Sequence, residues 1–291
     1  MPTATAVEPN AAVLAAVKKV SAIATLPEIT TKIIATVEDP NSSAASLHKI
    51  ISHDPALVAR VMKVVNSAFY GLPGQIASIE RAIVLLGLNA IKNIAVSASL
   101  GQLFRGVSLC EGYSAKDLWK HCVAVGVAAR ELARQMKFPL ADEAFLAGMI
   151  HDVGILVALQ TMPEKLRQVC QTVRGGDREF CEVEAEIMGM DHQQLGMALA
   201  AQWKFPRSVQ LVAGYHHCPT VLAEEHALLA RMVYVADSLA CDGSIGFNLT
   251  AKHQKLESAT LAELNIDAGI VEHTRAALPN LVQECSSIFG S

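Results

Sequence analysis

Apolar residues recur at intervals of three and four along most of the chain, the spacing of helices that bury one face. In the first hundred residues this pattern predicts five short helices. Their expected starts are Pro27, Asn41 or Ser42, Asp54 with Pro55, Ser78, and a position near Leu88. The first should run to about Val37, and the third should continue to Gly71, where a glycine can end it. We therefore expect a helical lobe in this half.

The periodic pattern lapses between Phe104 and Tyr113 and resumes at Ser114, where Asp117 stands three residues on, in the position of a capping box. The following helices are expected over residues 114–136, 141–160, 163–174, 178–188, 191–203, 206–217 and 224–241. Two more should fill the remainder to Ser291, with Pro279 breaking or kinking the last. No segment alternates long enough to build a sheet, so the pattern predicts an all-α protein in two helical lobes.

Composition supports helices and argues against one class of partner. The chain is 52% hydrophobic but only 5% aromatic, and its apolar residues are mainly Ala, Leu, Val and Ile, which suits packed helices. The formal net charge is -4, and no window gathers Lys and Arg into a stripe that could neutralise several phosphates. We therefore expect no nucleic-acid partner.

The N-terminal sequence and the cysteines indicate the cellular compartment in which the protein is expected. The opening MPTATAVEPN lacks the basic start and apolar core of a signal peptide, and we find no run of about 18 apolar residues to span a bilayer. The 7 cysteines are an odd number without a CxxC pair, which indicates reduced, mostly buried thiols. Cys122 and Cys218 each follow or adjoin a histidine, so a reactive thiol is the alternative there. We expect a cytoplasmic protein without membrane contact.

The stretch AGMIHDVGIL places His151 and Asp152 side by side in an otherwise apolar run. Burying an unpaired carboxylate or imidazole costs several kcal/mol, so the pair needs a hydrogen-bonding group, an opposite charge or a metal. Other histidines and carboxylates of the second half also stand among small and aliphatic residues. The set is His121, His151, Asp152, His192, His216, His217 and Asp237.

These residues form a ligand series of imidazoles and carboxylates without a thiolate, which suits iron, manganese or zinc. A carboxylate can bridge two ions, which makes Asp152 the natural shared ligand of a two-metal site. Asp117 lies one helical turn before His121 and is expected to point the same way. The remaining histidines are interpreted as ordinary core or surface residues: His48, His53, His226, His253 and His273.

Five segments, taken in order, resemble a known family: LPEITTKI, ISHDPALVARVMKVVNSAFYG, SIERAIVLLGLNAIKNIAV, LWKHCVAVGVAARELA and FLAGMIHDVGILV. Over residues 18–217 the chain is similar to the HDOD domain, the bacterial HD-related output domain. The resemblance implies an HD-like multi-helix bundle with an N-terminal lobe at 18–105 and an HD-like lobe at 114–217. Residues 1–17 would form an N-terminal helical extension, and residues 218–291 would complete the HD-like lobe.

The resemblance extends to metal-dependent HD phosphohydrolases and to the HD-GYP phosphodiesterases of cyclic di-GMP, which hold one or two divalent metal ions. It implies one metal set of His121, His151, Asp152 and Asp237, and a second of His192, His216 and His217 with Asp152 bridging. Asp117 matches the position of an extra acidic ligand that is a Glu in the HD-GYP pattern. No residue is assigned a catalytic role, except Asp152 if the protein is active.

Two departures from the hydrolytic pattern favour a regulatory role. The HDxGK motif has a lysine where this chain has Ile155, and no DGxGYP segment follows His216 and His217. The first hypothesis is therefore a signal-transduction output domain that binds a protein partner and, as a further ligand, a nucleotide, without turnover. The alternative is a metal-dependent phosphohydrolase that acts on a nucleotide or phosphomonoester.

Overall fold

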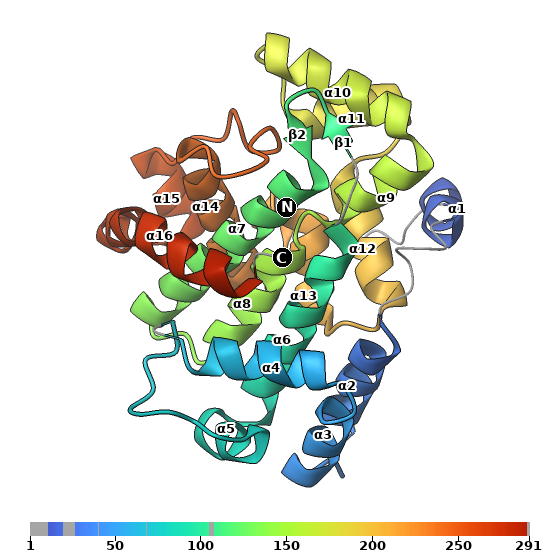
Figure 1. Ribbon diagram of the computed structural model, residues 1–291. Helices are drawn as coiled ribbons and strands as arrows, with labels where there is room; N and C mark the ends of the chain where they lie inside the picture. The colour runs from blue at the N-terminus through green and yellow to red at the C-terminus, as the bar shows by residue number, and fades with distance from the viewer. Residues whose placement is uncertain (1–10, 20–26, 40, 68, 105–107, 290–291) are drawn as a thin grey trace.

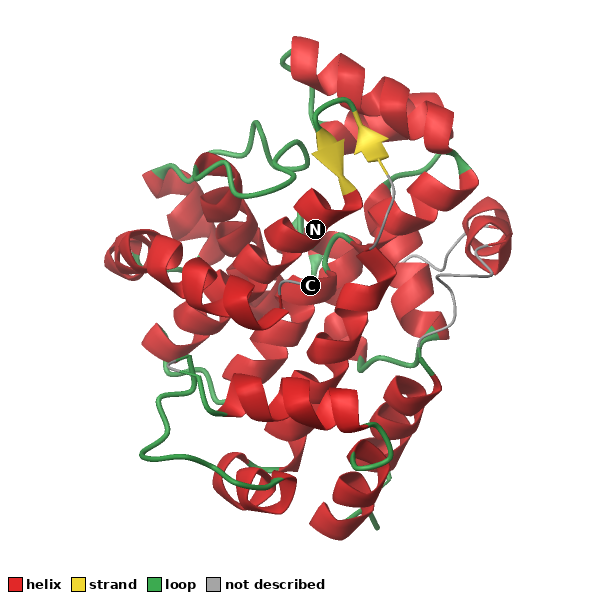
Figure 2. Cartoon of the chain, in the orientation of Figure 1, coloured by secondary structure: helices red, strands yellow, loops and turns green. Residues whose placement is uncertain are grey.

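The computed structural model describes residues 11–19, 27–39, 41–67, 69–104 and 108–289, and the described chain is all-helical apart from one short hairpin (Figures 1 and 2). The first helices are α1 (Ala11–Lys19), α2 (Glu28–Glu38), α3 (Ala44–Ile51), α4 (Pro55–Val65), α5 (Ile79–Leu86) and α6 (Leu88–Leu100), followed by the 3-10 turn η1 (Gly101–Phe104). This confirms the expected fold class. Residues 1–10 of the expected N-terminal extension lie outside the described ranges.

The second half begins with the antiparallel pair β1 (Ser108–Cys110) and β2 (Tyr113–Ser114). It continues with α7 (Ala115–Gln135), α8 (Ala141–Ile150), α9 (Val153–Thr161), α10 (Pro163–Gly175), α11 (Phe180–Met188), α12 (His192–Gln202), α13 (Arg207–Tyr215), the turn η2 (Pro219–Val221), α14 (Glu224–Asp242), α15 (Ser258–Leu264) and α16 (Ala268–Phe289). Helix α7 packs against α8, α14 and α16, while α9 and α13 pack against α12. Helix α1 packs on α9 and α12, away from α2 to α5 (Figure 1).

A buried arginine joins the two lobes where α8 meets the loop after α4. Arg130 donates from Nε to Asp142 Oδ1 at 3.0 Å and from Nη1 to the carbonyl oxygen of Phe69 at 3.0 Å. Its guanidinium carbon lies 4.2 Å and 4.4 Å from the ring centroids of Phe69 and Tyr70. The Tyr70 hydroxyl also donates to Asp142 Oδ1, at 2.8 Å. A guanidinium so partnered fixes the start of α8 against the N-terminal lobe.

Several helix boundaries differ from those the sequence predicts. Helix α4 ends at Val65 and not at Gly71, because the Asn66 side chain donates to the carbonyls of Met62 and Ile76 and accepts from the N–H of Ile76. The cap of α3 is Ser43, whose hydroxyl accepts from the N–H of Ser46, and not Asn41 or Ser42.

Three further expectations are corrected in the second half. The helix expected over 141–160 is interrupted at residues 151–152, which separate α8 from α9. Helix α11 starts at Phe180, two residues after the expected position, and α16 runs unbroken through Pro279.

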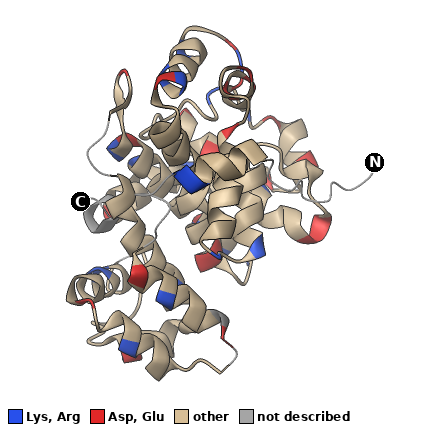
Figure 3. Cartoon of the chain, turned by 90° about the vertical axis from the view of Figure 1, so that its right-hand side faces the viewer, with Lys and Arg blue, Asp and Glu red and all other residues tan. Residues whose placement is uncertain are grey.

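One stretch of the described chain bears on the expectation that no segment spans a membrane. The run Ala141–Thr161 is long and apolar enough by composition, but 89% of its window is buried within the protein. It is formed by α8 and α9, which pack in the core of the HD-like lobe. Positions of Lys and Arg alternate with positions of Asp and Glu along the ribbon in Figure 3.

Two glycine contacts allow the helices on either side of His151 and Asp152, called the HD pair below, to approach their neighbours. A Cβ on Gly148 of α8 would lie 2.6 Å from the Cα of Gly126 in α7. A Cβ on Gly154 of α9 would lie 1.9 Å from the carbonyl oxygen of His192 at the start of α12. Backbone therefore packs on backbone on both sides of the HD pair, and no larger residue fits without moving a helix.

We predict that Gly154→Ala lowers the free energy of unfolding by about 3 kcal/mol or more, because the added methyl collides with main chain that cannot rotate away. The matched control is Gly175→Ala at the end of α10, where an added Cβ meets nothing within 4 Å. That variant should change stability by only about 0.5 kcal/mol. Urea denaturation of both variants in chelator measures the difference, and equal midpoints would contradict the close packing.

Candidate metal centre

The structure brings all seven predicted ligand residues together inside the HD-like lobe. They come from five places in the chain: the middle of α7, the break between α8 and α9, the start of α12, the end of α13 and the middle of α14. Six of the seven are fully buried, and only His217 retains exposure, with 10% of its side chain accessible. A cluster of this size without solvent must compensate its own charge.

One set of donor atoms consists of His121, His151 and Asp237. The Nε2 atom of His121 lies 3.1 Å from Asp237 Oδ1, and the Nε2 atom of His151 lies 4.0 Å from the same oxygen. The facing atoms of all three residues lie within 4.8 Å of one another. The set therefore surrounds one point, as the ligands of a single ion would.

A second set consists of Asp152, His192, His216 and His217. The Nε2 atom of His192 lies 3.3 Å from the Nε2 atom of His216 and 3.1 Å from that of His217. Three imidazole nitrogens and a carboxylate thus face one another in a second small volume next to the first.

Asp152 divides its two oxygens between the sets. Its Oδ2 lies 3.3 Å from the Nε2 atom of His151 and 3.7 Å from that of His121. Its Oδ1 lies 3.3 Å from the Nε2 atom of His192 and 3.5 Å from that of His216. This is the arrangement of a carboxylate that bridges two ions, with one oxygen directed to each.

Local backbone structure explains how adjacent residues serve different sets. His151 follows α8 in helical conformation, whereas Asp152 has φ −94° and ψ 14°, outside the regular helix. The interruption turns the two side chains relative to a straight helix, and α9 resumes at Val153. His192 is the first residue of α12, where Asp191 and Gln194 form a capping box that fixes the start of the helix.

The imidazoles are oriented by hydrogen bonds on their outer nitrogens. The Nδ1 atom of His151 lies 2.7 Å from the carbonyl oxygen of Gly148, and that of His216 lies 3.1 Å from the carbonyl oxygen of Val212. Because a carbonyl can only accept, Nδ1 carries the proton in both rings. In the neutral form of each ring, Nε2 then presents a lone pair to the centre, as metal-ligating histidines do.

Side chains orient the other two rings of the second set. The Nδ1 atom of His192 donates to Glu184 Oε2 at 2.6 Å, and the Nδ1 atom of His217 faces Gln254 Oε1 at 2.6 Å. Glu184 and Gln254 are residues that sequence reasoning missed. Glu184 had a detectable signal, because it lies on the buried stripe of α11 with Phe180 and Val183, where a carboxylate requires a partner.

Several buried atoms of the ligand residues have no hydrogen-bond partner in the part of the chain that the structure describes. Among the described residues, no group hydrogen-bonds to Nε2 of His121 or His151, to Oδ1 of Asp152 or to Oδ2 of Asp237, although all are buried. Lone pairs that converge without a donor between them repel one another and require a cation. The arrangement of these donor atoms therefore fits divalent metal ions.

The pKa shifts of the imidazoles in the metal-free protein also indicate that the centre favours positive charge. Burial disfavours a charged imidazole at His151, yet the Asp152 carboxylate raises its pKa above the usual value. Burial likewise opposes charge on His192, but Glu184 raises its pKa well above the usual value. Burial lowers the pKa of His216 to about 4, so this ring stays neutral. In the metal-free protein, protons on His151 and His192 would balance the neighbouring carboxylates.

Asp117 does not join either set, which corrects the expectation of an extra acidic ligand. Its Oδ2 accepts from the N–H and the hydroxyl of Ser114, at 2.8 Å and 2.6 Å, and completes the capping box at the start of α7. The capping prediction is confirmed, and it explains why this carboxylate is held at the helix start.

Cys181 forms a third group with Glu184 and His192, but its chemistry differs. Burial raises the pKa of the Cys181 thiol to about 12, so the sulfur stays protonated. The Nδ1 atom of His192 in this group is already bonded to Glu184. The group therefore supports His192 from outside the centre.

A loop between α14 and α15, residues 243–257, contacts Asp152 and His217 of the centre and is called the cover loop below. Gly246 has a φ of 73° and lies so close to α7 that a Cβ there would be 2.3 Å from the carbonyl oxygen of Asp117. Thr250 donates to Asp152 Oδ2 at 3.4 Å. Lys252 Nζ lies 3.0 Å from the carbonyl oxygen of Val173 at the end of α10, where a cation is favourable. These contacts hold the loop against α7, Asp152 and the end of α10.

Comparison with known proteins identifies the family of this fold. The family model described as the HDOD domain matches residues 23–219. An uncharacterized protein of Treponema pallidum (strain Nichols) is 25% identical over 220 residues, which is 75% of this chain and 42% of that protein. The chain thus spans less than half the length of this curated relative.

Two solved structures share the fold. A protein from Shewanella amazonensis SB2B, proposed to be a phosphohydrolase, is 24% identical with a TM-score of 0.75, over 96% of this chain and 98% of that one. A protein from Marinobacter aquaeolei VT8, proposed to act in signal transduction, is 23% identical with a TM-score of 0.72, over 92% of this chain and 60% of that one. The likeness carries the fold and leaves function to the site.

We predict that Glu184→Gln lowers the pKa of His192 in the metal-free protein, because the charge that opposes its burial is removed while the shape is kept. Titration of the imidazole nitrogens by NMR measures the change. Glu186→Gln, on the same helix but in an ion pair with Arg178, is the control and should leave His192 unchanged. An unaltered His192 titration in Glu184→Gln would contradict the assigned role.

Proposed function

Since the chain belongs to the HDOD domain family, we propose that it is a regulatory domain of bacterial signal transduction that binds two divalent metal ions and does not hydrolyse a phosphate substrate. The observation that carries the metal-binding proposal is the division of the Asp152 oxygens between two sets of convergent donors. Iron, manganese and zinc suit this mixture of imidazole and carboxylate ligands.

His121, His151 and Asp237 would hold one ion, and His192, His216 and His217 the other, with Asp152 shared. Bound ions would supply two fixed positive charges that replace protons on the imidazoles. In this chain the ligands tie α7, α12, α13 and α14 to the junction of α8 and α9. Metal occupancy would therefore set how firmly the HD-like lobe is held together, which gives a regulatory domain two distinguishable states.

Two observations support a role without turnover. Ile155, where the hydrolytic HDxGK pattern has lysine, is fully buried, so this position offers no cation to a substrate phosphate. The ligand side chains are also buried beneath the cover loop, and a phosphate ester needs direct access to such a centre. We also propose that the protein acts in the cytoplasm, with a signalling protein as partner and a nucleotide as a further ligand.

The second candidate is a metal-dependent phosphohydrolase that acts on a nucleotide or phosphomonoester. It is favoured by one observation, the bridging geometry of Asp152, which two-metal hydrolases use. Movement of the cover loop would be required before a substrate could reach the centre.

Metal content tests the proposal directly. We expect elemental analysis of protein purified without oxygen, or reloaded with Fe(II), Mn(II) or Zn(II), to give about two ions per chain. His121→Gln and His216→Gln should each lose one ion, and Asp152→Asn should lose both. His226→Gln, an exposed histidine, is the matched control. A metal-free wild-type protein after reloading would refute the assignment.

Turnover separates the two candidates. We expect the metal-loaded protein to release no phosphate from nucleoside monophosphates or a chromogenic phosphodiester above the level of Asp152→Asn. Loading at about 100 times Kd should meanwhile stabilise the fold by about 2.7 kcal/mol. Hydrolysis by the wild type that disappears in Asp152→Asn would establish phosphohydrolase activity and overturn the proposed regulatory role without turnover.

Metal uptake should release protons near neutral pH. The pKa values of His151 and His192 are raised, so these rings carry protons in the metal-free protein that a metal ion must displace. Apparent affinity for the metal should therefore rise with pH and fall as the rings are protonated. Calorimetric titration at one pH in two buffers of different ionisation enthalpy measures the released protons, and identical heats would contradict the prediction.

A further inference from the structure

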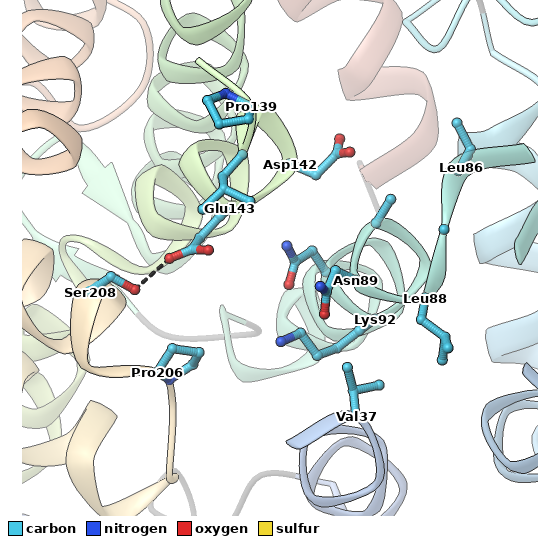
Figure 4. Close-up of a pocket in the computed structure, with 14 residues that line it drawn as sticks. Val37, Leu86, Leu88, Asn89, Lys92, Pro139, Asp142, Glu143, Pro206 and Ser208 are labelled. Atoms are coloured by element: carbon cyan, nitrogen blue, oxygen red, sulfur yellow. Dashed lines mark hydrogen bonds between the residues drawn. The ribbon is translucent and has the colours of Figure 1, made fainter. Parts of the chain in front are cut away.

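A cavity of about 700 Å³ lies between the two lobes and is lined by none of the seven ligand residues. Its wall is formed by the end of α2, the junction of α5 and α6, and the beginnings of α8 and α13 (Figure 4). We call it the interlobe pocket. Pockets of this volume enclose small organic ligands in other proteins.

Three helices begin at the wall of this pocket. Gly87 precedes α6, Leu140 precedes α8 and Pro206 precedes α13, and none of the three helices has a side-chain cap. The unbonded N–H groups of a helix start carry partial positive charge and favour anions. Three such helix starts border one pocket, which favours an anionic group there.

An unpartnered buried amide is the second observation that points to a ligand. Asn93, in the second turn of α6, lines the pocket and is only 5% exposed. Within the described ranges, no residue hydrogen-bonds to its side chain. Lys92, 7% exposed, belongs to the same wall, and Figure 4 shows its ammonium group turned toward Pro206. A buried amide costs free energy unless a ligand or water satisfies it.

Apolar side chains line another part of the wall, and the carboxylates of Asp142 and Glu143 line a third. Val37, Leu86, Leu88 and Leu140 contribute side chains beside these polar groups. A site with a cationic, donor-rich end and an apolar surface suits a ligand that is an anion at one end and a compact organic group at the other. A phosphate uses several donors better than a carboxylate, because it presents three oxygens and up to two charges.

We propose that the interlobe pocket binds a small organic phosphate, with its phosphate at the start of α6 beside Lys92 and Asn93. The organic part packs against the apolar wall. Glu143, which accepts a hydrogen bond from Ser208 in the same wall, sets the opposite, acidic side and orients the phosphate toward α6.

The pocket is connected to the metal centre by two helices. Helix α8 leads from Asp142 and Glu143 to the HD pair, and α13 leads from Ser208 to the paired histidines that follow it. Each spans about 15 Å, and the Ser208 to Glu143 hydrogen bond joins their starts. A phosphate that draws these starts toward α6 moves rigid elements that carry ligands of both ions. This coupling rests on the proposed metal-binding function, whereas ligand binding does not.

Calorimetric titration of the metal-free full chain tests the pocket, with AMP as the organic phosphate probe and inorganic phosphate as the reference. We expect AMP to bind more tightly than phosphate by about ten-fold or more, because only AMP uses the apolar wall. Asn89→Asp, an exposed substitution at the start of α6, should weaken AMP binding by about ten-fold while leaving the fold intact.

Lys92→Met should weaken AMP binding to a similar extent. The control is Lys49→Met, which removes an exposed lysine of α3 in the same lobe and should bind AMP as the wild type does. No AMP binding by the wild type, equal affinities for AMP and phosphate, or full affinity in Asn89→Asp would each overturn the proposed site.

Mn(II) affinity, measured against a competing chelator with and without saturating AMP, tests the coupling. We expect a change of about five-fold or more, matched by an equal change in AMP affinity on metal loading. AMP binding with unchanged Mn(II) affinity would overturn the coupling and leave the pocket standing. A protein that binds AMP but no metal would instead overturn the proposed function.

Discussion

The buried carboxylate of Asp152 is the constraint on which this lobe depends. It stands between two groups of imidazoles with no solvent to share its charge, so the surrounding rings or bound ions must supply the compensation. The lobe is arranged to hold it there. The helix is interrupted at the HD pair, and Gly154 lets α9 approach α12 at main-chain distance, which brings His192 to Asp152. The ligand geometry therefore depends on the packing of the core, and a change in either alters the other.

Sequence reasoning found the ligands because each is a polar residue on a face that should be apolar. The same contrast between residue type and surroundings predicted the helices and most of their caps. It failed where tertiary contacts decide. The helix over 141–160 is interrupted because Asp152 must turn toward a second set of residues, and α4 ends early because Asn66 bonds to a loop ten residues away. Asp117 had two local interpretations, cap and ligand, and only the folded structure separates them.

The supporting residues show the same limit. Glu184 could have been found from its place on the buried stripe of α11, but its partner is fixed only by the packing of α11 on α12. Gln254 lies in a loop, where no periodicity marks a residue as buried, and its contact with His217 spans 37 positions. Such residues decide which nitrogen of each ring faces the centre, so they determine whether an imidazole can act as a ligand at all.

The burial of the ligand residues bears on the choice between a hydrolytic and a regulatory role. A hydrolytic centre must admit substrate between its ligands and solvent, yet the cover loop is tied to α7, α10 and Asp152 at once. Breaking those contacts costs free energy that an enzyme would have to recover from substrate binding, and the buried Ile155 offers no charge for that purpose. A regulatory domain has no such requirement. In the proposed regulatory role the ligands can stay buried, and the N-terminal lobe would act on them through α8, whose Asp142 is bonded to Tyr70.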